Sequence, residues 1–90
     1  MSVELELSSI FGGFTNDQLV FQMNGKTVGE CLDQLVTKFP DLKPVLYDKK
    51  DNFYGAYDVY VNGESAYPQQ MSTPVKNGDK LDLVLLIHGG

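Results

Sequence analysis

Residues 77–87, NGDKLDLVLLI, decide the fold, because they place a tight turn directly before a long apolar run. Asn77-Gly78-Asp79 has the composition of a turn. Residues 80–87 predict a strand in which the acidic Asp82 belongs in solvent. The side chains that should then face the core are Leu81, Leu83, Leu85 and Ile87.

Val84 and Leu86 share the face of Asp82 in this pattern, and they are apolar. The same alternation in a strand predicted at residues 57–61 exposes Tyr60. Two interpretations stay open. These side chains are scattered surface hydrophobes, which are common, or they form an apolar docking patch together with Val20.

Two further strands are predicted near the N-terminus. Val3, Leu5 and Leu7 alternate with polar residues, which is the period of a half-buried strand. After a Gly-containing loop at residues 11–17, the alternation resumes with Leu19, Phe21 and Met23. The two runs therefore predict a hairpin.

A helix is predicted from Thr27 to Phe39. Thr27-Val28-Gly29-Glu30 matches a capping box, in which the Thr27 hydroxyl accepts from the N–H of Glu30 and the Glu30 carboxylate accepts from that of Thr27. Pro40 forbids continuation. The apolar stripe at helical spacing consists of Val28, Leu32, Leu35, Val36 and Phe39, with Cys31 at its edge.

The rest of the chain reads as a short turn at 44–47, a polar loop at 48–52, a short edge strand at 64–66 and a loop at 67–73. The order is strand, strand, helix, strand, short strand, strand. One helix covers only one face of a sheet, so the pattern predicts an α+β fold with four to five strands packed on one main helix.

Composition limits the function. Ninety residues make a single domain, 1–90, and a net charge of −5 argues against non-specific nucleic-acid binding and favours a partner with basic or apolar surface. One cysteine and one histidine cannot build a four-ligand zinc site, so we expect no metal. Neither a signal peptide nor a transmembrane run is visible, so a cytoplasmic location without a membrane partner is the default expectation.

No catalytic constellation stands out. Cys31 lies on the inner edge of the predicted helix and is better explained as a small buried hydrophobe than as a nucleophile. His88 is better explained as a solvated tail residue. Gly89 and Gly90 have no side chain to pack, but they suit a carboxylate that another protein must activate. Glycine leaves the reacting carbon unhindered and lets a flexible tail, residues 88–90, thread a narrow channel.

Four segments together resemble the β-grasp sulfur carriers of the MoaD/ThiS family. These are Asn77-Gly78-Asp79-Lys80-Leu81, the terminal Gly89-Gly90, TVGECLDQL at residues 27–35 and VYVNGE at residues 59–64. The resemblance covers essentially the whole chain and implies a β-grasp, ubiquitin-like fold. The loop at 41–55 is long for the thiamine carrier, which favours the molybdopterin-type and cysteine-type carriers.

By resemblance, a MoeB/ThiF-like adenylating enzyme activates the Gly90 carboxylate with ATP, and a sulfur donor enzyme converts it to a thiocarboxylate. Gly89 and His88 would thread into the partner, while Leu86, Val84 and Tyr60 dock. The chain itself is then a carrier rather than an enzyme and binds no cofactor. The implied pathway is the biosynthesis of molybdopterin, the molybdenum/tungsten cofactor, in which the tail would insert into the large subunit of molybdopterin synthase.

Other functions fit the same tail. A ubiquitin-like modifier would join Gly90 to target lysines, and a carrier could serve cysteine, thiamine or tRNA thiolation instead. A β-grasp interaction module with incidental glycines is the third possibility.

Overall fold

The computed structural model of this chain describes residues 2–86 and places strands and helices in the predicted order. The strands are β1 (Val3–Leu7), β2 (Val20–Met23), β3 (Tyr57–Val61), β4 (Glu64–Ser65) and β5 (Lys80–Leu85). The α-helices are α1 (Val28–Lys38) and the single turn α2 (Lys43–Leu46), and three 3₁₀ turns are η1 (Ser9–Phe14), η2 (Pro40–Leu42) and η3 (Gln70–Ser72).

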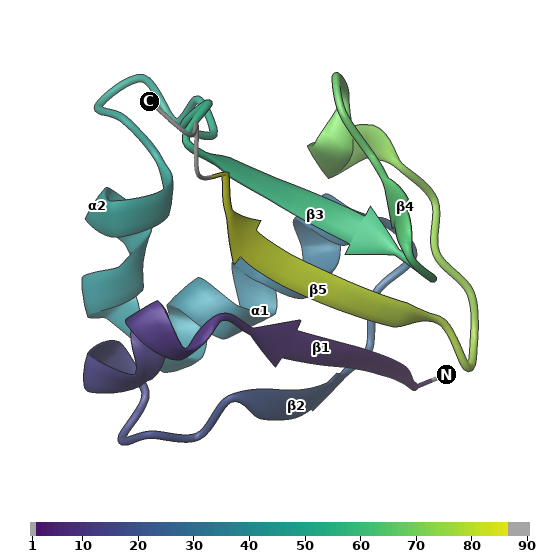
Figure 1. Cartoon of the computed structure of the whole chain (residues 1–90), viewed down its shortest axis with the longest axis horizontal. Coiled ribbons are helices and arrows are strands. Elements are labelled where there is room, and N and C mark those ends of the chain that lie inside the picture. Colours follow the sequence, from purple (N-terminus) through teal and green to yellow (C-terminus); the bar gives the residue numbers. More distant parts are fainter. Residues whose placement is uncertain (1, 87–90) are drawn as a thin grey trace.

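The five strands form one mixed sheet in the order β2-β1-β5-β3-β4. β5 lies in the middle, parallel to β1 and antiparallel to β3, and α1 crosses the far face of the sheet in Figure 1. The register sets Leu5 beside Leu81 and Val59 beside Leu83, so buried residues meet across the central strands. The predicted α+β architecture, a mixed sheet on one main helix, is confirmed.

The core lies between this sheet and α1. Each core face has the period predicted from the sequence: alternate residues of β1 and β5 and every third or fourth residue of α1 are buried. The fully enclosed members include Val3, Leu5, Val28, Cys31, Leu32, Leu35, Val59, Leu81 and Leu83. Burial of each large aliphatic side chain contributes about 1.5–3 kcal/mol, so this double layer is the main source of stability.

α1 begins and ends where capping chemistry predicts. The Thr27 hydroxyl accepts from the Glu30 N–H at 3.1 Å, and Phe39 closes the helix before Pro40. The reciprocal half of the predicted box is wrong: Glu30 Oε1 accepts from the N–H of Lys26, at 3.1 Å, instead of from that of Thr27. α1 has 11 residues, and no helix within residues 2–86 is long and apolar enough to cross a membrane.

Three details differ from the predictions. The segment at 11–17, predicted as a loop, contains most of the 3₁₀ turn η1. Phe11 anchors this turn, because its side chain is buried and its ring centroid lies 5.5 Å from that of Tyr57, edge-on. β5 ends at Leu85, and Ile87, predicted as a core residue, lies outside the described residues. Leu85 was expected to face the core but is 38% exposed, since it ends the strand opposite the half-buried Tyr57.

Candidate functional site

The face of the sheet turned away from α1, called here the outer face, carries the predicted docking residues. The register sets Val20 beside Glu6, Glu6 beside Asp82, and Asp82 beside Tyr60, in one row across four strands. Alternation along β5 adds Val84 to the same face. Tyr60 and Val20 therefore lie at opposite ends of this row, separated by two carboxylates.

Tyr60, Val84 and Leu86 are brought together, as the sequence predicts. They line one shallow hollow of about 420 Å³ with Gly63, Asp82 and Leu85. Tyr60 was expected to be exposed, but it is half-buried. Its strand is flanked by both β5 and β4. Val20 is 46% exposed and does not line this hollow, so the predicted patch reduces to Tyr60, Val84 and Leu86.

The accessible part of the outer face ends at Asp58, on the side of β4. Asp58 is 3% exposed although it lies on the same face as Tyr60, because the β4–η3 segment covers it. Its carboxylate accepts from the Ser65 hydroxyl, from Gln70 Nε2 at 3.2 Å and from the Val59 N–H at 2.8 Å. These bonds fix the covering segment and leave the hollow beside it accessible.

The centre of the outer face is acidic. Lys80 Nζ lies 3.4 Å from Glu6 and 3.9 Å from Asp82, and hydrogen bonding to Glu6, followed by the charges of Asp82 and Glu6, raises the Lys80 pKa. These pairs are half-exposed, so they contribute little to stability. With Glu4, three carboxylates surround one ammonium, and a basic partner surface complements them.

Strand β5 ends next to this hollow. The N–H of Leu86 donates to the carbonyl of Ala56 at 2.7 Å, one residue beyond the end of β5. The predicted activation and threading residues, Gly90, Gly89 and His88, lie outside the described residues.

Cys31 is a core residue, as the sequence predicts. Its side chain is fully buried, and burial followed by the nearby Glu30 carboxylate raises the pKa of the thiol. A thiol kept protonated and out of solvent is a poor nucleophile. Within residues 2–86 no three His, Cys, Asp or Glu side chains gather as metal ligands.

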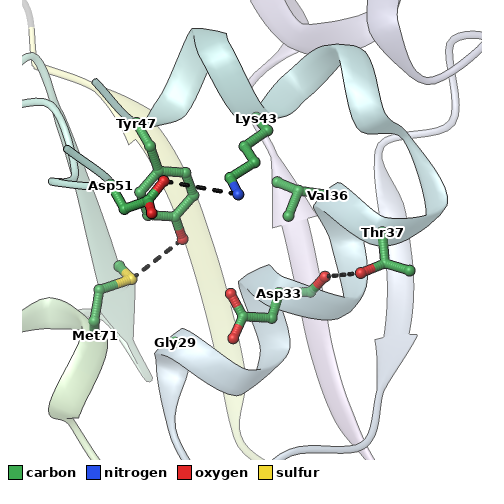
Figure 2. A pocket seen from close by; sticks show the side chains of 8 residues that line it. All are labelled: Gly29, Asp33, Val36, Thr37, Lys43, Tyr47, Asp51 and Met71. Atoms are coloured by element: carbon green, nitrogen blue, oxygen red, sulfur yellow. Dashed lines mark hydrogen bonds and ion pairs between the residues drawn. The ribbon is translucent and has the colours of Figure 1, made fainter. Parts of the chain in front are cut away.

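Sequence reasoning missed a second hollow, on the helical side of the molecule (Figure 2). Asp33 from α1, Tyr47 and Asp51 from the segment after α2, and Met71 from η3 converge on it. The sequence indicates part of this lining, because helical spacing places four of its residues on one face of α1: Gly29, Asp33, Val36 and Thr37. The contributions from the other two segments are not visible in any local pattern.

Comparison with known structures shows what this geometry is similar to. A chain of the BexX/CysO complex of Amycolatopsis orientalis matches with a TM-score of 0.84 and 25% identity, over 98% of this chain and 99% of that one. SAMP1 of Haloferax volcanii matches with a TM-score of 0.84 and 26% identity over 100% of both chains.

A more distant match is the complex of subunits 1 and 2 of the molybdopterin-converting factor of Helicobacter pylori. Its TM-score is 0.64 at 21% identity, over 100% of both chains, which shows the fold alone. No curated protein sequence matches significantly. The model of the ThiS family matches residues 6–90, nearly the whole chain. This chain therefore belongs to the ThiS family, and its fold is that of the β-grasp, ubiquitin-like sulfur carriers and modifiers.

Proposed function

We propose that this protein is a sulfur carrier whose Gly90 carboxylate is adenylated by a partner enzyme and converted to a thiocarboxylate. The observation that carries the proposal is the family match, which runs through Gly90 and so includes both glycines. The sheet supports it, because the last described backbone bond, from Leu86 to Ala56, lies at the end of the central strand. The four residues that follow would span at most about 14 Å when fully extended.

The division of labour follows from this arrangement. A MoeB/ThiF-like adenylating enzyme holds the ATP, the carboxylate oxygen attacks the α-phosphate, and pyrophosphate leaves. Sulfur from a donor enzyme then displaces AMP. This chain supplies the reacting carboxylate, the reach of the tail and a docking surface, so we propose a co-substrate rather than an enzyme, acting in the cytoplasm.

The docking surface is the hollow lined by Tyr60, Val84 and Leu86. Its apolar floor suits an apolar side chain of the adenylating enzyme, and the carboxylates of Glu6 and Asp82 beside it suit basic residues around that side chain. The hollow adjoins the point where the chain leaves β5. A partner seated there is therefore well placed to receive the tail.

A modifier function is the second candidate. The similarity to SAMP1 over the whole of both chains supports it as strongly as the similarity to the CysO complex supports a carrier. In this alternative the same activated Gly90 forms an amide bond with a lysine of a target protein. Fold and tail suit both outcomes, and one activation step precedes either.

The pathway that the sulfur enters is proposed from the sequence. Molybdopterin biosynthesis, with the large subunit of its synthase as partner, is the pathway we expect. The molybdopterin-converting factor has a TM-score of 0.64 and the CysO complex one of 0.84, so similarity of fold gives molybdopterin no preference over cysteine, thiamine or tRNA thiolation.

Intact-mass analysis of the protein purified from its native host tests the proposal. A carrier shows replacement of one oxygen by sulfur at Gly90, located by fragmentation of the C-terminal peptide. A modifier shows adducts linked through lysine. An unmodified carboxylate, in cells and after incubation with the host's adenylating enzyme, ATP and a sulfur donor, would refute both. The variant lacking Gly90 is the matched control.

A further inference from the structure

The hollow on the helical side is open to solvent and is lined by three parts of the chain that are far apart in the sequence. α1, α2 with the loop that follows it, and η3 line about 480 Å³, and the close-up in Figure 2 shows polar atoms pointing into it. α1 and η3 approach closely at Gly29, where a Cβ would lie 2.8 Å from the carbonyl oxygen of Met71. The apolar part of its lining comes from Val36 and Met71.

Tyr47 presents unused acceptor capacity to this hollow. Its side chain is nine-tenths buried, and its hydroxyl donates to Met71 Sδ at 3.5 Å, although a thioether is a weak acceptor. Among residues 2–86 nothing donates to the hydroxyl oxygen. The Asp33 carboxylate points into the same space from an exposed position, and it has no hydrogen-bond or ion-pair partner within the described residues.

The charges around the hollow leave it negative. Lys43 Nζ lies 3.7 Å from Asp51 Oδ1, so its charge offsets that of one carboxylate. Both side chains are largely exposed, and the ion pair is therefore weak. Asp33 is left uncompensated. Burial, and then the charges of Asp33 and Asp51, raise the pKa of Tyr47 to about 12, which agrees with a negative potential at the hydroxyl.

We propose that this hollow receives a basic side chain, arginine or lysine, from a partner protein. The cationic head would donate to the Asp33 carboxylate and to the Tyr47 oxygen, and its aliphatic stem would lie along Val36 and Met71. The hollow lies on the helical side, whereas Tyr60, Val84 and Leu86 lie on the outer face. Its occupant can therefore bind while the outer face is covered, and the proposal stands independently of the sulfur chemistry.

NMR titration of the full chain tests this proposal with a short glycine–serine peptide that carries one central arginine. A single charge-assisted contact predicts saturable shifts at Asp33, Tyr47 and the Met71 methyl group, with a Kd on the order of 1 mM. The same peptide with citrulline, the neutral isostere of arginine, should bind about tenfold more weakly. A lysine peptide should shift the same resonances.

Two variants separate the site from general charge attraction. Asp33→Asn should weaken binding of the arginine peptide by about tenfold. Glu64→Gln removes the same charge from the exposed strand β4 and should leave binding unchanged. The proposal is overturned if citrulline binds as well as arginine, if both variants weaken binding equally, or if no shift at Asp33, Tyr47 or Met71 saturates. A spectrum of the Asp33→Asn variant that matches the wild type away from the substitution establishes that this variant is folded.

Discussion

Asn62 and Asp79, which lie in two different turns, are joined by a hydrogen bond from Asn62 Nδ2 to Asp79 Oδ1 at 3.0 Å. Asn62 Oδ1 accepts from the N–H of Lys80 at 2.9 Å, and Asp79 Oδ2 accepts from that of Lys76 at 2.9 Å. Asn62 and Gly78 both have positive φ, 51° and 90°. The turn after β3 therefore fixes the start of β5, on which the position of the tail depends.

This pair predicts a pH dependence. The Asn62 side chain, followed by the Lys76 N–H, lowers the pKa of Asp79 in the folded protein. A carboxyl group whose pKa is lower in the folded than in the unfolded protein stabilises the fold at pH values above its unfolded pKa. That contribution is lost as the pH falls through the folded pKa. We expect Asp79→Asn to lower the Tm at neutral pH and to reduce the fall in Tm on acidification, as measured by calorimetry.

Asp41→Asn is the control for this measurement, because it removes an equal charge from an exposed position in η2. Its Tm at neutral pH should match that of the wild type. Parallel Tm curves for the wild type and Asp79→Asn down to acid pH would show that the link between the turns carries no such contribution.

Gly29→Ala should destabilise the fold although alanine is the better helix former by about 1 kcal/mol. The new Cβ would lie 2.8 Å from the backbone oxygen of Met71, which cannot move as a side chain could. We expect a loss of about 1–3 kcal/mol in the free energy of unfolding, measured with urea. Gly13→Ala, with no described atom within 4 Å of its Cβ, should change it little. Equal values for the two variants would contradict the predicted clash.

Leu86→Asp should weaken binding to the adenylating enzyme of the host. A carboxylate placed in the apolar hollow adds to the acidic surroundings and loses apolar contact, so we expect Kd to rise about tenfold or more, by calorimetric titration. Val20→Asp is the matched control, because Val20 shares the face but not the hollow. If only Val20→Asp impaired binding, docking would lie at the β2 edge instead.

Deletion of Gly90 should abolish adenylation while leaving the fold intact, and Gly89→Ala should do the same. Glycine has no side chain to bury, so we expect a Tm equal to that of the wild type. ATP–pyrophosphate exchange with the adenylating enzyme measures activation, and circular dichroism measures stability. A markedly lower Tm for either variant would show that the glycines support the fold.

Local patterns predicted most of the architecture. The period of two in residues 3–7 and 80–83 reports the buried face directly, because neighbouring side chains in a strand point to opposite sides. Capping chemistry located the start of α1 at Thr27 for a similar reason, since donor and acceptor lie three residues apart.

Features built by distant segments escaped prediction. Leu85 follows the core alternation, but it is partly exposed because it is the last residue of its strand. No local pattern shows at which residue of a strand the burial ends. Asp58 is buried by a segment that folds over it from β4 and η3. The hollow at Asp33 and Tyr47 needs three segments brought together by the tertiary fold.

The central position of β5 has a mechanical consequence. An enzyme that grips the C-terminal end and pulls would apply tension along β5, which is hydrogen-bonded to β1 on one side and to β3 on the other (Figure 1). Both ladders lie across the direction of such a pull, so their bonds are loaded together in shear rather than opened one at a time. The strand that leads to Leu86 is thus held against such a pull by hydrogen bonds on both sides.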